Sequence, residues 1–444
     1  MEKVAVVGAG LVGSLLAIKL AKKGYSVSVF ERRPDLRKAE IIAGRSINLA
    51  LSNRGWKAIE GAGISDEIRS IAIPMTGRMM HSVEGELTYQ QYGKEDEAIY
   101  SVSRGELNRK LLLGADTYSN VDFYFNHRCL NVELDANELT FHNGETGTEV
   151  THQFDRIFAT DGAFSAVRAK MQRTDRFNYS QFYLDHGYKE LMIPANADGT
   201  HKLDKNALHI WPRGEFMLIA LANLDGSFTC TLFFPFEGKS SFSSLKTEAD
   251  VTTFFNEVFA DAVPLMPTLV EDYFNNPTAS LVTVRCEPWN YKDQVLMLGD
   301  ASHAIVPFYG QGMNSGFEDC TVLDEFMERF EGDWEAMFHN YSKTRKPDAD
   351  AISDLALRNF IEMRDLVADE SFLLRKRIEK KIYSKHPEKW IPLYSMVTFS
   401  HIRYSEALET GKQQDAIMEE IMAMPNIDEQ WDSPEVEAKI LSKL

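Results

Sequence analysis

The stretch that decides the fold is Lys3-Val4-Ala5-Val6-Val7-Gly8-Ala9-Gly10-Leu11-Val12-Gly13. Its first five residues form a short, valine-rich run, as expected of a buried parallel strand. Residues Leu11 to Lys23 have apolar side chains at helical spacing, and Gly24 predicts the end of that helix. A second strand is predicted from Ser26 to Phe30, with Glu31 at its end. The sequence therefore predicts the strand–helix–strand unit of an α/β fold.

This unit is typical of a dinucleotide-binding site. Gly8 allows the tight turn, Gly10 lets the backbone approach a pyrophosphate, and Gly13 lets the helix pack closely on the strand. The start of the helix offers N–H groups and a partial positive charge to the phosphates. Glu31 can accept hydrogen bonds from a ribose diol. On its own the motif leaves both NAD and FAD open as the dinucleotide.

A second glycine-rich region, residues 298–314, favours FAD. Asp293 to Leu298 is predicted to be a strand, and Asp300 follows it, where a carboxylate can hold a ribityl hydroxyl. Gly310 and Gly312 then open a predicted helix. The N–H groups of that helix can face the pyrimidine carbonyl of a flavin, where negative charge collects on reduction.

A third motif lies between the other two. Phe154 to Ala159 is predicted to be a strand that runs into Asp161-Gly162. Together the three motifs resemble the fingerprints of the single-component aromatic hydroxylases that use FAD and NADPH. Many relatives have glycine and alanine where this chain has Ala159 and Thr160, which weakens the link of this motif to pyridine nucleotide but not the fold. The resemblance implies an enzyme with FAD as cofactor, NADPH as reductant and O2 as co-substrate.

Further motifs are similar to one branch of this family, which hydroxylates an aromatic amino acid bearing a ring amino group. In that chemistry reduced flavin and O2 form a C4a-hydroperoxide, and the ring amino group activates the neighbouring carbon, so no dedicated base is required. Two alternatives stay open: a related hydroxylase of another aromatic acid, and a flavin-binding sensor without turnover. The motifs of this branch are residues 30–34, 44–51, 187–191, 207–212 and 394–400.

The amino-acid end of such a substrate needs a cation. Arg78 is the candidate, because a guanidinium can grip a carboxylate with two parallel hydrogen bonds. The resemblance implies that Tyr92 and Tyr394 donate to the same carboxylate, and that Asn359 contacts the amino or carboxylate end. No side chain is a certain catalytic residue, and Tyr309 is the candidate for a contact with the ring or a proton transfer.

Other arginines are expected to contact the FAD cofactor rather than the substrate. Arg104 follows Ser103, which forms a predicted capping box with Glu106, and a helix start is a poor place for a cation unless an anion lies nearby. The cofactor-binding residues expected from the motifs and the resemblance are Gly8, Gly10, Leu11, Val12, Gly13, Glu31, Arg32, Arg45, Arg104, Asp161, Asp300, Gly310, Gly312, Met313 and Asn314.

Composition narrows the class of protein. The formal charge of −18 argues against nucleic acid and anionic membranes as partners, since either needs a basic face. The four cysteines are scattered, which predicts no metal site and suits a reducing cytoplasm. No run of 18 apolar residues exists, so no membrane anchor is expected. The sequence indicates neither the oligomeric state nor a choice between NADPH and NADH.

The expected fold class is α/β, with a Rossmann-like FAD-binding domain, an antiparallel-sheet substrate domain and a C-terminal helical segment. The FAD-binding domain is discontinuous and comprises residues 1–75, 100–175 and 285–350. Residues 76–99 and 176–284 form the substrate sheet, and residues 351–444 are helical and cover the active site. Pro347 is predicted to break the helical pattern that begins at Trp334.

Overall fold

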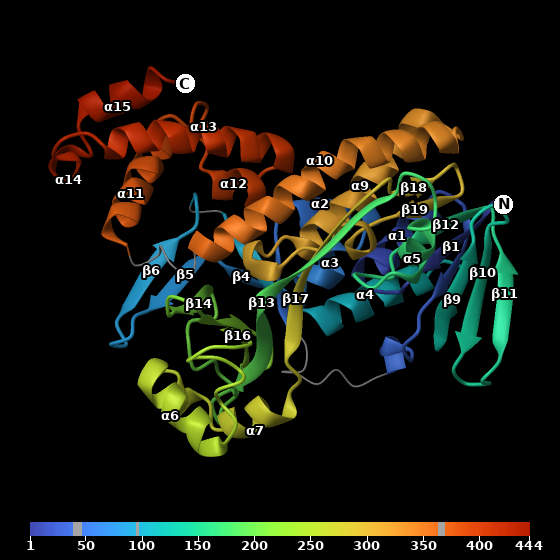
Figure 1. Cartoon of the computed structure of the whole chain (residues 1–444), viewed down its shortest axis with the longest axis horizontal. Helices are drawn as coiled ribbons and strands as arrows, with labels where there is room; N and C mark the ends of the chain where they lie inside the picture. The colour runs from blue at the N-terminus through green and yellow to red at the C-terminus, as the bar shows by residue number, and fades with distance from the viewer. Residues whose placement is uncertain (39–46, 95–96, 363–368) are drawn as a thin grey trace.

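The computed structural model describes residues 1–38, 47–94, 97–362 and 369–444 (Figure 1). Arg45, a predicted cofactor residue, lies outside them. Within the described residues, a six-stranded sheet has the order β18-β19-β12-β1-β2-β8. Its strands are β1 (Lys3–Val7), β2 (Ser26–Phe30), β8 (Val121–Tyr124), β12 (Arg156–Ala159), β18 (Asn290–Tyr291) and β19 (Val295–Met297).

All pairs of this sheet are parallel except β18 with β19. Residues 4–7 of β1 are buried on both faces, which explains their valine-rich sequence. Helix α1 (Leu11–Lys22) packs against α4 (Arg104–Asp116) and α9 (Gly312–Phe330). Phe30 stacks on Phe141 of a separate three-stranded sheet, formed by β9 (His127–Glu133), β10 (Glu138–Asn143) and β11 (Glu149–Gln153).

A second large sheet lies beside the first and has seven strands among the described residues, in the order β17-β13-β16-β15-β14-β5-β6 (Figure 1). A core rich in phenylalanine lies between this sheet and helices α6 (Glu248–Val258) and α7 (Leu269–Asn275). The strands are β5 (Gly77–His81), β6 (Leu87–Gln91), β13 (Asn178–Ile193), β14 (Ala207–Pro212), β15 (Met217–Ala222), β16 (Phe228–Pro235) and β17 (Ala279–Glu287).

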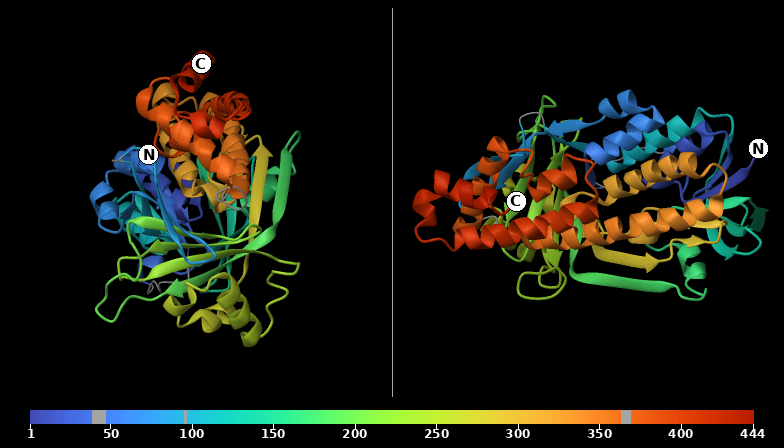
Figure 2. Two further views of the ribbon diagram at one scale, coloured as in Figure 1. Left: turned by 90° about the vertical axis from the view of Figure 1, so that its left-hand side faces the viewer. Right: turned by 90° about the horizontal axis from the view of Figure 1, so that it is seen from above.

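The end of the chain is helical, and its last helices cluster beyond one end of α10 (Figures 1 and 2). Helix α10 (Trp334–Ile361) runs without interruption through Pro347, so the predicted break there is wrong. Buried residues on both sides of the proline, among them Tyr341 and Ile352, hold the helix in the core despite the missing N–H. The others are α11 (Glu370–Lys385), α12 (Leu393–Thr398), α13 (Tyr404–Met422), α14 (Ile427–Gln430) and α15 (Pro434–Leu441).

The predicted fold class is confirmed: a mixed α/β chain with parallel and antiparallel sheets and C-terminal helices. The predicted domain boundaries stay a prediction, and helix α10 crosses the one at residue 350. Among the helices of the described residues, none combines the length and the apolar character that crossing a bilayer requires.

Candidate active site

The first glycine-rich turn leaves no room for side chains at two of its three glycines. Gly8 has a φ of +101°, and a Cβ there would lie 2.6 Å from the Thr160 carbonyl oxygen. A Cβ on Gly13 would lie 1.9 Å from the Gly8 carbonyl oxygen. A Cβ on Gly10, in contrast, would meet nothing within 4 Å. No side chain caps α1, whose first residues are Leu11 and Val12, so a pyrophosphate fits in the open space before its N–H groups.

Two side chains that the sequence analysis missed hold this turn in place. Thr160 donates from Oγ1 to the carbonyl oxygens of Val7 and Gly8, at 3.0 and 2.8 Å. Asn108 donates from Nδ2 to the Ala9 carbonyl oxygen at 3.1 Å. Both lie at least 99 positions in sequence from the carbonyl groups that they bind, so no local pattern could have revealed them.

Glu31 lies beside the turn at the end of β2. Its Oε2 accepts from the Ala9 N–H at 3.0 Å, and its Oε1 is 2.8 Å from Nε of Arg33. Burial raises the pKa of Glu31, but the hydrogen bonds and charge of Arg33 outweigh it and hold that pKa below its ordinary value. The carboxylate is therefore charged, as an acceptor for a ribose diol must be. Arg32, the next residue, is exposed to solvent.

The two glycine-rich regions meet in the structure. A Cβ on Gly299 would lie 2.9 Å from a methyl group of Val12. Asp300, the first residue of α8 (Asp300–His303), is exposed and close enough to Arg104 for their charges to interact. Asp161 accepts from the Ala166 N–H at 2.7 Å, and its other carboxylate oxygen is buried without a partner among the described residues.

Arg104 begins α4 as predicted, but the capping box is only half formed. The Ser103 hydroxyl accepts from the Glu106 N–H at 3.5 Å, whereas the Glu106 carboxylate pairs with Arg109 and does not reach back to Ser103. The exposed Arg104 guanidinium faces Glu190 of β13, a residue that the site prediction did not include. Burial raises the pKa of Glu190 to about 7, with the Arg104 charge opposing.

The last predicted cofactor residues begin α9. Gly310 adopts a φ of +68° after a short 3-10 turn, η3 (Pro307–Tyr309), and Gly312 starts the helix. The Asn314 side chain is already used, because it accepts from the Ser52 N–H at 2.9 Å and donates to the carbonyl oxygens of Ala50 and Gly310. A cofactor can therefore meet only backbone groups at Asn314. Met313 is buried.

A buried ionic network supports the Gly299–Asp300 turn. Asp319 of α9 accepts from the Gly299 N–H at 2.8 Å and from His303 at 2.5 Å, and Nε of Arg345 lies 2.9 Å away. Burial raises the pKa of Asp319, but the charges of His303 and Arg345 outweigh it, so that pKa is lowered.

Replacing Asp319 by asparagine is expected to cost about 3 kcal/mol of unfolding free energy, because buried Arg345 and His303 would lose the fully buried charge between them, and among the described residues only Glu318 and Asp348 would still pair with Arg345. Urea unfolding measures this, with the exposed Glu328→Gln on the same helix expected to cost about 1 kcal/mol or less. The difference from wild type should shrink as pH falls below the ordinary aspartate value of 3.8. An Asp319→Asn chain as stable as Glu328→Gln would contradict this role.

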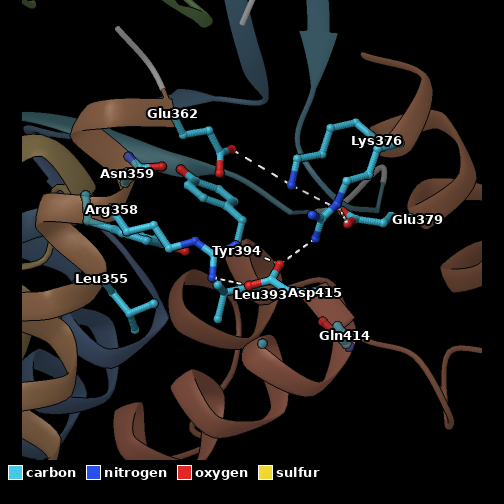
Figure 3. A pocket seen from close by; sticks show the side chains of 13 residues that line it. Leu355, Arg358, Asn359, Glu362, Lys376, Glu379, Leu393, Tyr394, Gln414 and Asp415 are labelled. Atoms are coloured by element: carbon cyan, nitrogen blue, oxygen red, sulfur yellow. Dashed lines mark hydrogen bonds and ion pairs between the residues drawn. The ribbon is translucent and has the colours of Figure 1, made fainter. Parts of the chain in front are cut away.

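The predicted substrate residues converge on one region. Tyr394 stacks between Tyr92 and Tyr309, with ring centroids 5.4 and 5.5 Å apart. The Arg78 guanidinium lies 4.7 Å from the Tyr394 ring centroid and 5.5 Å from that of Tyr92. Asn359 lines a pocket together with Tyr309 and Tyr394 (Figure 3). One cluster thus forms from residues of strand β5, the end of β6, turn η3 and helices α10 and α12.

Polar atoms in this cluster lack partners. Nε of Arg78 and the hydroxyl of Tyr92 are buried and make no well-formed hydrogen bond among the described residues, although the Tyr92 hydroxyl lies close to both the Arg78 guanidinium and Tyr394. Burial raises the pKa values of Tyr92 and Tyr309 well above the ordinary range, so both hydroxyls keep their protons and can donate. The cluster is therefore a set of donors around a cation, which suits an anionic group.

A charged rim surrounds the pocket and was missed by the sequence analysis (Figure 3). Asp415 of α13 pairs with Arg358 of α10 at 2.5 Å and with Arg375 of α11 at 2.5 Å. Arg375 also pairs with Glu379 at 2.8 Å. Arg358 and Arg375 are 57 and 40 positions from Asp415 and lie on two other helices, so only the packing of the helices brings the three charges together.

Comparisons with known proteins agree with this geometry. Residues 1–356 match the family model described as an FAD binding domain. The sequence is 56% identical to the kynurenine 3-monooxygenase of Flavobacterium johnsoniae, covering 100% of this chain and 98% of that protein. The chain belongs to the kynurenine 3-monooxygenase family. It is also 46% identical to the kynurenine 3-monooxygenase of Dictyostelium discoideum, covering 95% of this chain and 93% of that protein.

Membership of the kynurenine 3-monooxygenase family confirms two predictions: the protein is a monooxygenase, and its cofactor is FAD. Solved structures show the fold alone. A 2-methyl-3-hydroxypyridine-5-carboxylic acid oxygenase has a TM-score of 0.67 at 18% identity, covering 88% of this chain and 98% of that one. The p-nitrophenol 4-monooxygenase of Pseudomonas putida has a TM-score of 0.65 at 18% identity, covering 95% and 97%.

Proposed function

We propose that the protein hydroxylates L-kynurenine: L-kynurenine, NADPH, O2 and H+ give 3-hydroxykynurenine, NADP+ and water. Family membership supports the reaction class, and the half-buried Arg78, whose buried Nε has no hydrogen-bond acceptor among the described residues, supports a carboxylate-bearing substrate. The proposal includes a cytoplasmic setting, with which the four free cysteines agree, and a place in tryptophan catabolism toward NAD.

The Arg78 side chain is the main observation that supports this proposal. This side chain is half-buried and its buried Nε lacks an acceptor among the described residues, which is costly, and a substrate carboxylate would supply that acceptor together with a negative charge. The Tyr92 hydroxyl, which keeps its proton and makes no well-formed hydrogen bond among the described residues, would donate to the same carboxylate. Tyr394 would hold the arginine through its ring face.

The rest of the pocket would orient the substrate ring. The Phe308 ring stacks on Phe360, with 3.9 Å between the ring centroids, and its centroid lies 4.9 Å from that of Phe233. These three rings form an apolar wall next to Tyr309. Asn359 donates to the Phe308 carbonyl oxygen at 2.7 Å and so ties this wall to α10. Bound FAD supplies the activation of O2 after reduction by NADPH. The side chains bind the substrate, exclude water and keep Tyr309 protonated.

The flavin would be held at the other end of this region. Gly10 and the first turn of α1 would receive the pyrophosphate, and Glu31 would accept from the ribose. Asp300 and Arg104 would meet the ribityl chain and phosphates, and the backbone of Gly312 to Asn314 would face the flavin ring.

Steady-state turnover tests the proposed function. NADPH oxidation by the FAD-loaded protein is measured with L-kynurenine and with other aromatic acids, and the products are identified. We expect L-kynurenine to stimulate oxidation and to appear as 3-hydroxykynurenine. Stimulation by another aromatic acid alone would point to a related hydroxylase, and no stimulation by any of them would point to a sensor.

Tyr394 and Asn359 are expected to control coupling, because both come from C-terminal helices that close the pocket. Tyr394→Ala removes the ring between Tyr92 and Tyr309 and should let water reach the site. We expect most NADPH to yield hydrogen peroxide in Tyr394→Ala and Asn359→Ala. The measurement is peroxide and hydroxylated product per NADPH consumed.

Tyr394→Phe is the matched control, since it keeps the stacked ring and loses only the hydroxyl. It should weaken kynurenine binding yet stay better coupled than Tyr394→Ala. If both alanine variants hydroxylate with wild-type coupling and affinity, the C-terminal helices are not part of the active site.

A further inference from the structure

One strand edge on the outside of the molecule has no neighbour. Along residues 178–183, β13 pairs with β17 on one side. On its other side β16 begins to pair only at His186, so residues 178–184 present a free edge among the described residues. Both views of Figure 2 show the β13 and β17 pair at the rim of the molecule.

This edge lacks two of the usual protections against association. Residues Asn178 to Leu184 contain no charge and no proline, the features that normally keep exposed edges apart. Both faces of the segment are open: Phe182 is 59% exposed, Tyr183 46% and Tyr179 37%. An accessible edge with apolar rings on both faces is a template for pairing with another strand.

The apolar surface extends beyond the strand. Phe164, in the loop after Asp161, is 70% exposed. It lies near the edge, because Arg168 donates to the carbonyl oxygen of the adjacent Ala163 and lies 5.2 Å from the Tyr179 ring centroid. Four exposed rings therefore gather on this side of the molecule.

We propose that this edge pairs antiparallel with the same edge of a second copy of the chain, around a two-fold axis at Gln181. Such an interface is isologous, which is the usual form of a closed dimer. Tyr179 would lie opposite Tyr183 of the partner subunit, which forms a favourable cross-strand aromatic pair. Arg176 would come near Asp185 of the partner subunit, so the charges flanking the segment are complementary.

Charge and area favour a second copy as the occupant. Each chain carries a net charge of −18, so two copies repel one another, and they can approach at lowest cost through a segment without charges such as this one. From their exposed fractions, the four rings offer roughly 400 Å² per copy. Pairing would bury about twice that area from the rings alone, and the backbone and flanking residues would bring the total toward a standard interface.

The mass of the FAD-loaded chain in solution tests the proposal. Light scattering should give twice the chain mass of 50.4 kDa. Phe182→Glu combined with Tyr183→Glu should raise the dimer dissociation constant by about 100-fold, since it puts like charges at the centre of the interface. Leu224→Glu, at a residue 61% exposed in the β15–β16 turn, should leave the dimer intact.

A cysteine tests the register. Gln181→Cys places two thiols at the two-fold axis, within the reach of a disulfide, so mild oxidation should cross-link the copies. Leu224→Cys and the wild type, which has four free cysteines of its own, should not cross-link. The proposal is overturned by a wild-type chain that is monomeric at about 100 μM, by a double glutamate variant that dimerises like wild type, or by Gln181→Cys dimers that do not cross-link. FAD content and melting temperature confirm that each variant is folded.

Discussion

Gly10→Val is expected to leave the chain folded and to remove FAD from it. The backbone at Gly10 has φ −71° and ψ −172°, which any residue can adopt, and a Cβ there meets nothing within 4 Å. The valine side chain would instead occupy the space before α1 in which the pyrophosphate fits. Bound flavin should fall from about one per chain to almost none, and hydroxylation should fall with it.

The measurements are flavin absorbance per chain, circular dichroism and thermal unfolding. Gly13→Val is the informative contrast, because its Cβ would lie 1.9 Å from the Gly8 carbonyl oxygen, so this variant should misfold rather than merely lose cofactor. A folded Gly10→Val protein that keeps its full FAD content would remove the first glycine-rich turn from the flavin site.

Arg78→Ala is expected to weaken kynurenine binding by about 2–4 kcal/mol, the cost of losing one partner of a buried charged hydrogen bond. That corresponds to about a 30- to 1000-fold rise in the dissociation constant. Arg78→Lys should recover only part of the affinity, because an ammonium cannot form two parallel hydrogen bonds to one carboxylate.

Kynurenine binding is followed by the change in flavin fluorescence or by calorimetry, with FAD content as the control for folding. Arg173→Ala, which removes an exposed arginine far from the tyrosine stack in sequence, should bind like wild type. Tyr92→Phe should show a smaller loss than Arg78→Ala, since it removes one neutral donor. If Arg78→Ala binds kynurenine normally, the carboxylate is held elsewhere.

Features that depend on a few consecutive residues could be predicted from the sequence. The glycines at 8, 10 and 13, the valine-rich strand before them and Glu31 set a local backbone path, and the structure follows it. The same holds for the turn at Gly310, where only a residue tolerating a positive φ fits. The family, and with it FAD, followed from such local motifs.

Other local rules failed where packing opposed them. Pro347 was expected to end a helix, but its neighbours are buried against the core and α10 continues. Glu106 was expected to complete a capping box, but Arg109 is one turn further along the helix and takes its carboxylate. In both cases a tertiary or side-chain contact outweighs a local preference that is worth only a few kcal/mol.

The sequence by itself determined the strand–helix–strand unit, the two glycine-rich turns and the family, because each depends on residues that are neighbours in the sequence. Only the tertiary structure decided which side chains share a site. Arg78 of β5 meets the ring of Tyr394 of α12 over 316 positions of sequence, and Asp319 reaches Arg345 only because α9 packs on α10. Such partners depend on sheet register and helix packing, which are set by the sum of many weak contacts across the whole chain and leave no local signature.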